Sequence, residues 1–514
     1  MFTVTALSAT PRGISMARRS YPHSDFADLA APSQPCTVVV MHRSRDSRAA
    51  LRAMFVLSLP LAVLPRGDVQ SGRTYIPFNE AKPLFETLRA DLLPVDLRSK
   101  TTAQLESLWP DWVARRDTET RHRVLRGDED SLVNFLFFGV TFTQHPRISE
   151  NDVFTGLPRP ARDIAERRIA DLVRALSDPG ADERLQFGRA VVERQGIDPS
   201  TTAGRDRLRH YLSEAVDRTV ADAQGYIREN RASLARQRGE SAVEGAPGYT
   251  LYRARGLSSD TSIFANFGLE QGLEMLKSHG VLLPGSIKRV AVLGPGLDFT
   301  DKRDGYDFYP QQTIQPFAVV DSLLRLGLAT PNDVRVTTFD LSDRVNQHME
   351  AARARAGRGD AYVVHLPRDP YEWNPSLVEY WEQFGNHIGE ETKAAAVPPN
   401  APGVKVRAVR IRPAIVLSIV PRDLNIVLQR IKPSTPEGPF DLMVATNLFL
   451  YYDVFEQSLA MINVAKMLQG GGWLLTNNPV FDLPSTPMVT RGDVDVFYNS
   501  RSAGQDRIFF YQRQ

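Results

Sequence analysis

The sequence has only one cysteine, Cys36, among its 514 residues. One thiol can form neither a disulfide within the chain nor a zinc–thiolate cluster, so both are excluded. The nine histidines include no H-x-H or H-x-x-x-H pair, and we therefore expect no metal site. A single cysteine is typical of a reducing compartment, but it is equally compatible with export without disulfides.

An excess of charge of one sign is also missing. Lys and Arg together number 62 and Asp and Glu 60, which leaves a net charge of +2. This balance provides no general electrostatic attraction to nucleic acid or to an anionic membrane. The sequence also lacks a G-x-S-x-G elbow and a G-x-x-x-x-G-K-[ST] loop, which argues against α/β-hydrolases and P-loop nucleotide hydrolases.

We expect no transmembrane span. The apolar run from Met54 to Pro65 follows a basic flank and is too short to cross a bilayer as a helix. A basic flank before a short apolar core is typical of a secretory signal, here over residues 42–65, if translation starts at an internal methionine such as Met41. The alternative is an apolar segment within a poorly ordered leader, residues 1–72.

The whole sequence, with 42% hydrophobic and 24% charged residues, has the composition of a globular protein, and its length suits two or three domains. Residues 75–230 show helical periodicity, and in Arg162–Leu176 the apolar residues recur along one stripe. The segment 231–248, rich in Arg, Gly, Ser and Ala, is the predicted linker. We therefore expect a helical domain over 73–248 and a second domain over 249–514.

Strand and helix patterns alternate from Ser262 onward, which predicts βαβ units and a mostly parallel, doubly wound α/β sheet. We expect an irregular insert at about 357–410 and a closing C-terminal antiparallel hairpin. The predicted strands are Val290–Leu293, Val334–Phe339, near Ala414–Val420, Leu442–Thr446, Trp473–Thr476, Val494–Tyr498 and Arg507–Tyr511. The predicted helices are Glu270–His279, Ile314–Leu326, Asp343–Ala356 and Phe455–Leu468.

Polar residues and glycines follow these strands where a parallel sheet gathers its ligand-binding groups. The first strand runs into a Gly-Pro-Gly turn at 294–296, and two glycines let the backbone turn sharply and approach a ligand. Asp340 ends the second strand, Asp423 follows the third and Asn447 ends the fourth. Each alone also fits an ordinary turn or strand end, but the ordered set indicates a nucleotide-like ligand.

In this order, the glycine turn, the acidic strand end and the motif F-D-L-x-x-x-x-N-x-x-x-Y-Y-D at 440–453 resemble the class I S-adenosylmethionine (SAM)-dependent methyltransferases, over 262–514. Within that class the motif is most similar to the chemotaxis-receptor methyltransferase type. The resemblance implies SAM as the cofactor and transfer of a methyl group to an unidentified acceptor, a small molecule or a protein. It also implies a cytoplasmic location, where SAM is found.

The resemblance assigns roles to individual residues. Asn447, Tyr451 and Tyr452 would face the methyl donor and orient the acceptor, so catalysis would consist mainly of positioning. Asp340 would accept from the ribose hydroxyls, and the segment beginning at Asp423 would border the adenine. The implied cofactor-binding residues are Gly294, Pro295, Gly296, Asp298, Asp340, Leu341, Asp423, Leu424 and Asn447.

The sequence departs from the family pattern in the first motif. Asp298 stands where a third glycine is usual, and Val292 stands where an acidic residue is often found. The spacing from Gly296 to Asp340 is 340 − 296 = 44 residues, against about 20 in compact nucleotide-binding units. Much of the excess lies in the loop 299–313, which we expect to cover the pocket.

This loop carries acidic and aromatic residues that would suit a cationic or hydroxylated acceptor, with a carboxylate as base. Its acids recur at every third position, which does not fit an EF-hand. The alternative is a solvated acidic loop with aromatic side chains packed beneath it. The acceptor-binding candidates are Asp301, Asp304, Tyr306 and Tyr309.

Two other functions fit parts of the pattern. An NAD(P)-dependent oxidoreductase shares the glycine turn and the acidic second strand, but its G-x-G-x-x-G needs a glycine where this sequence has Phe299. A catalytically degenerate methyltransferase fold that serves as a binding module is favoured by the departures in the first motif.

Overall fold

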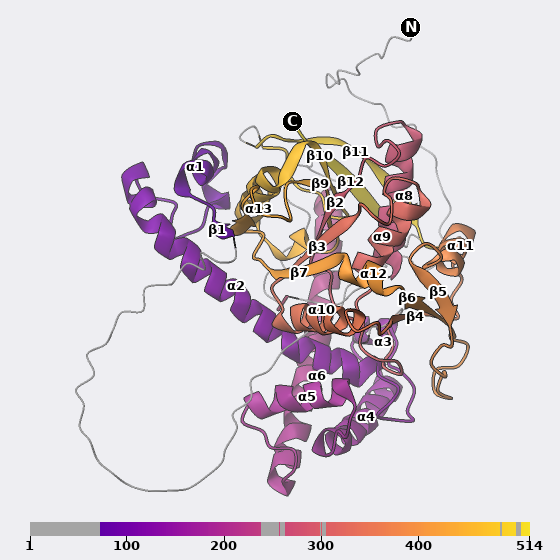
Figure 1. The fold of residues 1–514 in the computed structure, drawn as a ribbon. Coiled ribbons are helices and arrows are strands. Elements are labelled where there is room, and N and C mark those ends of the chain that lie inside the picture. The colour runs from indigo at the N-terminus through magenta and orange to yellow at the C-terminus, as the bar shows by residue number, and fades with distance from the viewer. Residues whose placement is uncertain are drawn as a thin grey trace, which may run out of the picture.

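The computed structural model describes residues 72–237, 256–257, 263–298, 300, 305–483, 486–499 and 505–514. The leader up to residue 71, with the signal predicted at 42–65, lies outside these residues, as does most of the linker predicted at 231–248. Helices dominate the N-terminal part, and an α/β region follows it (Figure 1). None of the described helices is long and apolar enough to cross a bilayer.

The N-terminal part is helical, as its periodicity predicted. Its elements are β1 (Arg73–Tyr75), α1 (Phe78–Thr87), η1 (Ala90–Leu92), α2 (Thr102–Phe138), α3 (Glu150–Phe154), α4 (Arg159–Ser177), α5 (Glu183–Arg194) and α6 (Thr202–Gln237). α2 has 37 residues and begins with a capping box, in which Thr101 and Gln104 bond to each other's backbone amides. The C-terminal half of α2 packs with α3 to α6 in a helical core that includes Leu136, Leu172 and Leu212.

A seven-stranded sheet forms the centre of the α/β region. Its strands are β2 (Arg289–Leu293), β3 (Arg335–Asp340), β7 (Ile419–Asp423), β9 (Phe440–Ala445), β10 (Leu468–Thr476), β11 (Met488–Phe497) and β12 (Gln505–Arg513). In space their order is β11-β12-β10-β9-β2-β3-β7. Strands β10, β9, β2, β3 and β7 run parallel, and β12 pairs antiparallel with both β10 and β11. The predicted mostly parallel sheet with a C-terminal antiparallel hairpin is therefore confirmed.

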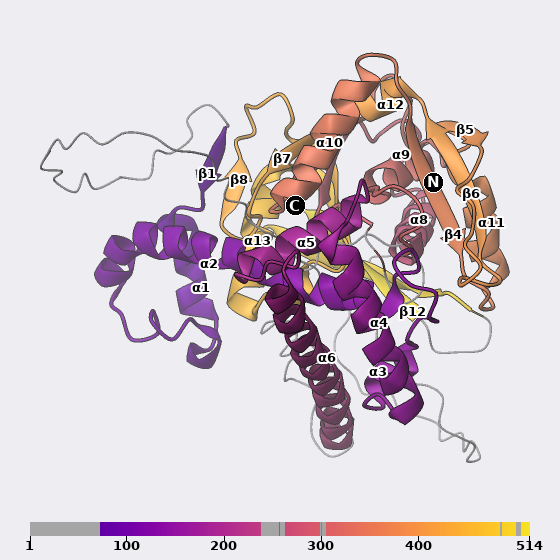
Figure 2. The ribbon, with the colours of Figure 1, turned by 90° about the horizontal axis from the view of Figure 1, so that it is seen from below.

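Helices cover both faces of this sheet (Figures 1 and 2). They are α8 (Ile263–Ser278), α9 (Gln315–Arg325), α10 (Asp343–Ala356) and α13 (Val454–Met467). Val290 and Val292 of β2 pack in one core with α8, α9 and α10. Ala291 and Leu293 pack in the other core, with α13. Because successive side chains of a strand point to opposite faces, one apolar strand serves both cores, as in doubly wound folds.

The prediction for the third strand was partly wrong. The apolar residues near Ala414–Val420 form a short helix, α12 (Pro413–Leu417), and β7 begins only at Ile419. Pro413 occupies the first helical position, where its fixed φ and its missing N–H cost nothing. A short apolar run does not by itself distinguish a strand from a buried helix, which explains the error.

The insert predicted to be irregular contains regular structure. It forms β4 (Tyr362–Arg368), α11 (Pro375–Gln383), β5 (Gly389–Thr392) and β6 (Lys405–Ile411). These strands make an antiparallel three-stranded sheet in the order β4-β6-β5. β4 contains Pro367, and it lies at the edge of this sheet, where proline is tolerated.

The N-terminal helices complete one face of the large sheet. The connection from β7 to β9, residues 424–439, is described throughout and contains no helix, only β8 (Gln429–Ile431). β8 pairs antiparallel with β1, which brings the N-terminal part against this connection. Phe85 of α1 and Trp112 of α2 lie against Phe455 of α13, with ring centroids 5.4 and 5.8 Å apart. α1 and α2 therefore provide the cover that a crossover helix would otherwise supply.

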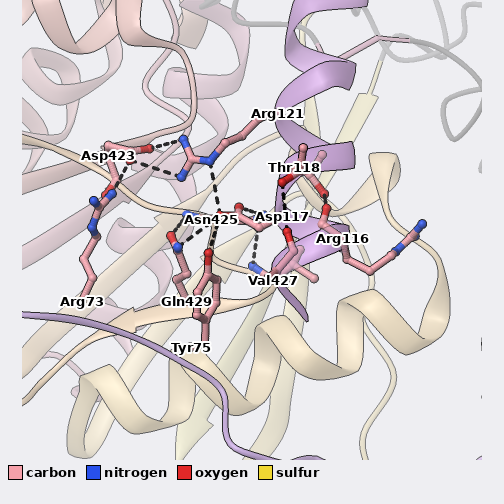
Figure 3. A network of polar contacts seen from close by, with 12 residues as sticks. Arg73, Tyr75, Arg116, Asp117, Thr118, Arg121, Asp423, Asn425, Val427 and Gln429 are labelled. Atoms are coloured by element: carbon pink, nitrogen blue, oxygen red, sulfur yellow. Dashed lines mark hydrogen bonds and ion pairs between the residues drawn. The ribbon is translucent and has the colours of Figure 1, made fainter. Parts of the chain in front are cut away.

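A buried carboxylate, Asp117, joins α2 to the β7–β9 connection (Figure 3). Its Oδ1 accepts from Asn425 Nδ2 at 2.8 Å. Its Oδ2 accepts from Tyr75 Oη at 2.9 Å and from Gln429 Nε2 at 3.3 Å, and Arg121 lies within ion-pair distance at 3.4 Å. Donors from β1, from α2 and from the connection therefore all converge on one side chain.

Replacing Asp117 by Asn keeps the shape of the side chain but places an amide donor among other donors. We expect Asp117→Asn to lower the free energy of unfolding by about 1–3 kcal/mol. Asp111→Asn, at an exposed position of the same helix, should change it by less than about 0.5 kcal/mol. Urea denaturation followed by circular dichroism compares the two, and equal stabilities would contradict the role given to Asp117.

Candidate functional site

The parallel part of the sheet has a topological switch point between β2 and β9. From β2 the chain adds β3 and β7 on one side, and it then returns to place β9 and β10 on the other side. At such a point the loops after the two central strands diverge and leave a crevice at the carboxyl ends, where ligands of open α/β sheets bind. The residues that follow β2, β3 and β9 therefore form the candidate site.

The turn after β2 requires glycine for its backbone conformation. Gly294 and Gly296 have φ values of +64° and +70°, in the left-handed region that side chains disfavour. A Cβ on Gly294 would meet only Leu448 Cδ1 at 3.6 Å, an ordinary contact. The amide of Gly294 donates to the carbonyl of Phe339 at 2.8 Å, so the turn is bonded to the end of β3.

Asp340, at the end of β3, lies directly beside this turn. Its carboxylate accepts from the amide of Ser342 at 2.7 Å and from the amide of Gly296. Burial raises the pKa of Asp340 to about 6, although these two hydrogen bonds and the charge of Arg344 favour the ionised form. The predicted acid and the predicted glycine turn are thus in contact.

The residues predicted to border the adenine are held by arginine side chains and by packing in the core. Asp423 is the register partner of Asp340 on the neighbouring strand. Its carboxylate accepts from Arg121, with Nη1–Oδ1 and Nη2–Oδ2 distances of 2.8 and 3.2 Å, and it also pairs with Arg73. Leu424 is buried in the core that α1, α2 and α13 share, and Leu341 packs at its margin.

Asn447 follows β9 in an unusual conformation, with a φ of +57°. A reciprocal pair of hydrogen bonds with Asn477 holds it: Asn477 Oδ1 accepts from the Asn447 amide at 2.7 Å, and Asn477 Nδ2 donates to Asn447 Oδ1 at 2.6 Å. Asn477 follows β10, the neighbour of β9 in the sheet. Asn477 is not among the predicted site residues, although it is a polar residue after a strand, the signal that identified Asn447.

Gln315, at the start of α9, is a second residue that the sequence analysis missed. It is buried, and its Nε2 donates to Thr446 Oγ1 at 2.6 Å, beside the switch point. Its Oε1 is buried and accepts no hydrogen bond from any residue within the described ranges. A buried acceptor without a donor is costly, so this oxygen suits a ligand that donates a hydrogen bond.

Tyr451 and Tyr452 both lie inside the protein, in the segment between β9 and α13. The guanidinium of Arg123, on α2, lies 5.8 Å from the ring centroid of Tyr452 and donates to the carbonyl of Tyr451 at 2.7 Å. Burial raises the pKa of Tyr452 above its usual value, so this phenol stays protonated at neutral pH. Helix α2 therefore fixes the segment that contains the two tyrosines.

Asp298 and Tyr309 bond to each other within the loop that follows the glycine turn. The hydroxyl of Tyr309 donates to Asp298 Oδ2 at 2.8 Å, and Gln312 Nε2 donates to the same oxygen at 3.1 Å. Tyr306 is also buried, with the guanidinium of Arg147 lying 4.3 Å from its ring centroid. The predicted packing of aromatic residues beneath the loop is therefore present at these two tyrosines.

The acidic residues Asp301 and Asp304, predicted to bind an acceptor, lie outside the described residues.

Arg184, on α5, holds the described part of this loop from the helical region. It is buried, and its guanidinium donates to four backbone carbonyls, those of Tyr309, Tyr306, Asp307 and Asp298, at 2.5, 3.2, 3.3 and 3.3 Å. No local pattern predicts this contact, because Arg184 is 122 residues from Tyr306 in the chain.

Asp307, in the loop, also bonds to the helical region. Asp307 accepts from the amides of Val140 and Thr141, which follow α2, at 2.7 and 2.8 Å. It also accepts from the hydroxyl of Thr141 at 2.5 Å. Together with Arg184, this carboxylate attaches the loop to the helical region from both directions.

Within the part of the chain that the structure describes, no three His, Cys, Asp or Glu side chains converge as metal ligands.

No protein-family model matches this chain, and no curated protein matches it. Among solved structures, the chain is similar to the N-methyltransferase NodS from Bradyrhizobium japonicum WM9, at 14% identity over 48% of this chain and 94% of that one, with a TM-score of 0.23. It is similar to magnesium protoporphyrin IX methyltransferase (ChlM) from Synechocystis PCC 6803 with bound SAM, at 11% identity over 57% and 97%, with a TM-score of 0.23. A TehB-like SAM-dependent methyltransferase from Corynebacterium glutamicum ATCC 13032 matches at 10% identity over 48% and 98%, with a TM-score of 0.20. Similarity at this level carries no weight for the activity of this chain, and the chemotaxis-receptor type stays a prediction.

Arg184→Met retains an unbranched apolar side chain but removes every hydrogen bond to the loop carbonyls. We expect the amides of 305–312 to exchange with solvent deuterium roughly tenfold faster or more in this variant, because local opening becomes easier. Arg167→Met, at an exposed position of α4, is the matched control and should leave the exchange unchanged. Equal protection of 305–312 in both variants would show that Arg184 does not hold the loop.

Proposed function

We propose that this chain is a SAM-dependent methyltransferase that binds its methyl donor at the carboxyl ends of β2, β3 and β9. The observation that supports this most directly is the contact between the Gly296 amide and the buried carboxylate of Asp340 at the switch point. A nucleoside site needs a turn at which the ligand can approach the backbone closely. It also needs an acid that accepts hydrogen bonds from the ribose diol.

The residues at this edge fit the chemistry of SAM. Gly294 and Gly296 turn the backbone sharply, so that it would pass close to the methionine end, and Asp340 would accept from the ribose hydroxyls. Gln315 Oε1, a buried acceptor without a donor among the described residues, would accept from the ammonium group. When bound, SAM would supply an electrophilic methyl group on its sulfonium, and the protein has only to align a nucleophile with it.

Asp423 and Leu424 would form the adenine side of the pocket in this proposal. Since Arg73 and Arg121 already bind the carboxylate of Asp423, that carboxylate would act chiefly by fixing the end of β7. Leu424 and the partly buried Leu341 would supply apolar surface beside the ring.

The acceptor would be oriented by Asn447, together with the segment that contains Tyr451 and Tyr452. Asn477 fixes the side-chain oxygen of Asn447, so its amide nitrogen has a defined direction. Because the phenol of Tyr452 stays protonated, we assign it positioning rather than proton abstraction. Tyr306 and Tyr309 would anchor the covering loop, and Asp301 and Asp304 stay the proposed acceptor-binding residues. The acceptor is a small molecule or a protein.

Calorimetric titration of the full chain with SAM, S-adenosylhomocysteine and NAD tests this proposal. We expect micromolar binding of the first two and no binding of NAD. Binding of NAD alone would instead identify an oxidoreductase. If none of the three binds, the chain is a degenerate fold that serves as a binding module, and the proposal fails.

The ionisation of Asp340 gives a second test. Its pKa of about 6 means that the free protein carries a neutral acid there at lower pH. If ribose binds the carboxylate, the affinity for SAM should be constant above pH 6 and fall by up to about tenfold per pH unit below it. Asp340→Asn should weaken binding by roughly tenfold or more near neutral pH and abolish this pH dependence.

Asp343→Asn, at an exposed position at the start of α10, is the control and should retain the affinity and its pH dependence. Stability provides an independent check that Asp340→Asn is folded. A pKa raised from 3.8 to about 6 means that the neutral acid stabilises the fold at low pH and that this contribution is lost as the pH rises through 6. The Asn variant should therefore be at least as stable as the unmodified protein at neutral pH, and unchanged SAM affinity in it would contradict the proposed pocket.

A further inference from the structure

Asp506, at the start of β12, is a carboxylate that none of the assignments above uses. β12 runs antiparallel to β10, and Phe509 is the register partner of Thr476, the last residue of β10. Since Asp506 precedes Phe509 in β12, it lies beyond the carboxyl end of β10. That is the edge of the sheet at which the residues after β2, β3 and β9 form the candidate site.

Hydrogen bonds connect Asp506 to Asn447, the residue proposed to orient the acceptor. Asp506 Oδ2 accepts from Asn477 Nδ2 at 3.4 Å, and the same nitrogen donates to Asn447 Oδ1 at 2.6 Å. The hydroxyl of Tyr498 also donates to Asp506 Oδ2, at 2.6 Å. Asp506 therefore lies next to the pair of asparagines at the proposed acceptor position.

Only one oxygen of this carboxylate takes part in these contacts. Oδ1 accepts no hydrogen bond from any residue within the described ranges. Asp506 is partly exposed, and Oδ1 is not among the polar atoms that the protein encloses. A ligand at this edge of the sheet can therefore reach Oδ1.

No described cation balances the charge of Asp506, since no Arg, Lys or His of the described residues lies within ion-pair distance of it. Arg507 points to the opposite face of the sheet, where it pairs with Asp493 and Asp495 at 3.3 and 2.8 Å. Burial raises the pKa of Asp506, and only its two neutral donors favour the ionised form. A carboxylate in such a setting gains most from a positively charged partner.

We propose that Asp506 Oδ1 binds the amino group of the methyl acceptor, so that the acceptor is an amine. Asn447 is also next to the proposed donor site, because Leu448 Cδ1 would be 3.6 Å from a Cβ on Gly294. The amine is therefore held beside that site. This inference rests on the function proposed above, because it identifies the bound amine as the methyl acceptor.

The carboxylate also provides the proton acceptor that an amine needs. An ammonium nitrogen has no lone pair, so it cannot react as a nucleophile. The bound ammonium transfers one proton to Oδ1, which leaves a neutral acid and a nitrogen lone pair, and the acid later returns the proton to solvent. The raised pKa of Asp506 favours this transfer, because it stabilises the neutral acid.

The test uses the full chain in the absence of SAM, with its asparagine side chains labelled with ¹⁵N, and three probes that share one ring. Benzylamine is a cation at neutral pH, benzyl alcohol is neutral and benzoate is an anion. We expect benzylamine to move the Asn477 side-chain resonance in a saturable way at concentrations up to about 20 mM, since so small a ligand binds weakly. Benzyl alcohol should bind at least about fivefold more weakly, because its hydrogen bond to Oδ1 lacks the positive charge, and benzoate should not bind. Asn477→Ser identifies the resonance.

Asp506→Asn removes the charge but keeps the shape of the side chain and an oxygen for Tyr498. It should weaken benzylamine binding at least about fivefold, for the same reason as benzyl alcohol. Asp493→Asn, at an exposed position of the same hairpin, is the matched control and should retain the affinity. Circular dichroism checks that both variants are folded, and the comparison of probes uses the unaltered protein.

The inference is overturned if benzylamine leaves the Asn477 resonance unmoved, if benzyl alcohol binds as tightly as benzylamine, or if Asp506→Asn binds benzylamine with unchanged affinity. Because the titration contains no SAM, its outcome is separate from that of the SAM titration. SAM binding without amine binding would overturn this inference alone. Amine binding without SAM binding would overturn the proposed function and, with it, the identification of the amine as a methyl acceptor.

Discussion

The packing of α2 against β1 and the β7–β9 connection is organised around one buried carboxylate, that of Asp117. A charge inside a protein is costly unless donors surround it, and here the donors come from β1, from α2 and from the β7–β9 connection. The three segments must therefore come together for the charge to be tolerated. Once they do, α1 and α2 cover one face of the sheet, and Arg121 reaches Asp423 at the end of β7.

A matching pair of contacts attaches the opposite border of the candidate site to the helical region. Arg184 donates to the carbonyls of the loop after β2, and Asp307 accepts from amides that follow α2. Charge-assisted hydrogen bonds of this kind are stronger than neutral ones and demand a defined geometry. Asp340 and the glycine turn thus lie between two borders, β7 and the loop, that are both held by N-terminal residues. The helical region determines the shape of the site without supplying its central residues.

The segment between β9 and α13 is held by contacts along its whole length. It begins at Asn447, whose left-handed conformation is held by Asn477, and it ends at Asp453, which caps α13. Arg123 of α2 binds the segment between these points. The segment that contains Tyr451 and Tyr452 is therefore fixed at both ends and in its middle.

The sequence by itself determined the parallel sheet, the glycine turn and the acid at the end of β3. These depend on local properties: apolar runs long enough for buried strands, residues that tolerate a positive φ, and helical periodicity, which placed α10 at Asp343–Ala356 as observed. Only the tertiary structure decided that Asp423 is bound by arginines, that Arg184 clamps the loop, and that Trp112 keeps a donor without an acceptor among the described residues. The physical reason is that such contacts join segments more than a hundred residues apart, as with Arg184 and Tyr306 at a separation of 122, and no pattern along the chain carries the geometry that pairs them.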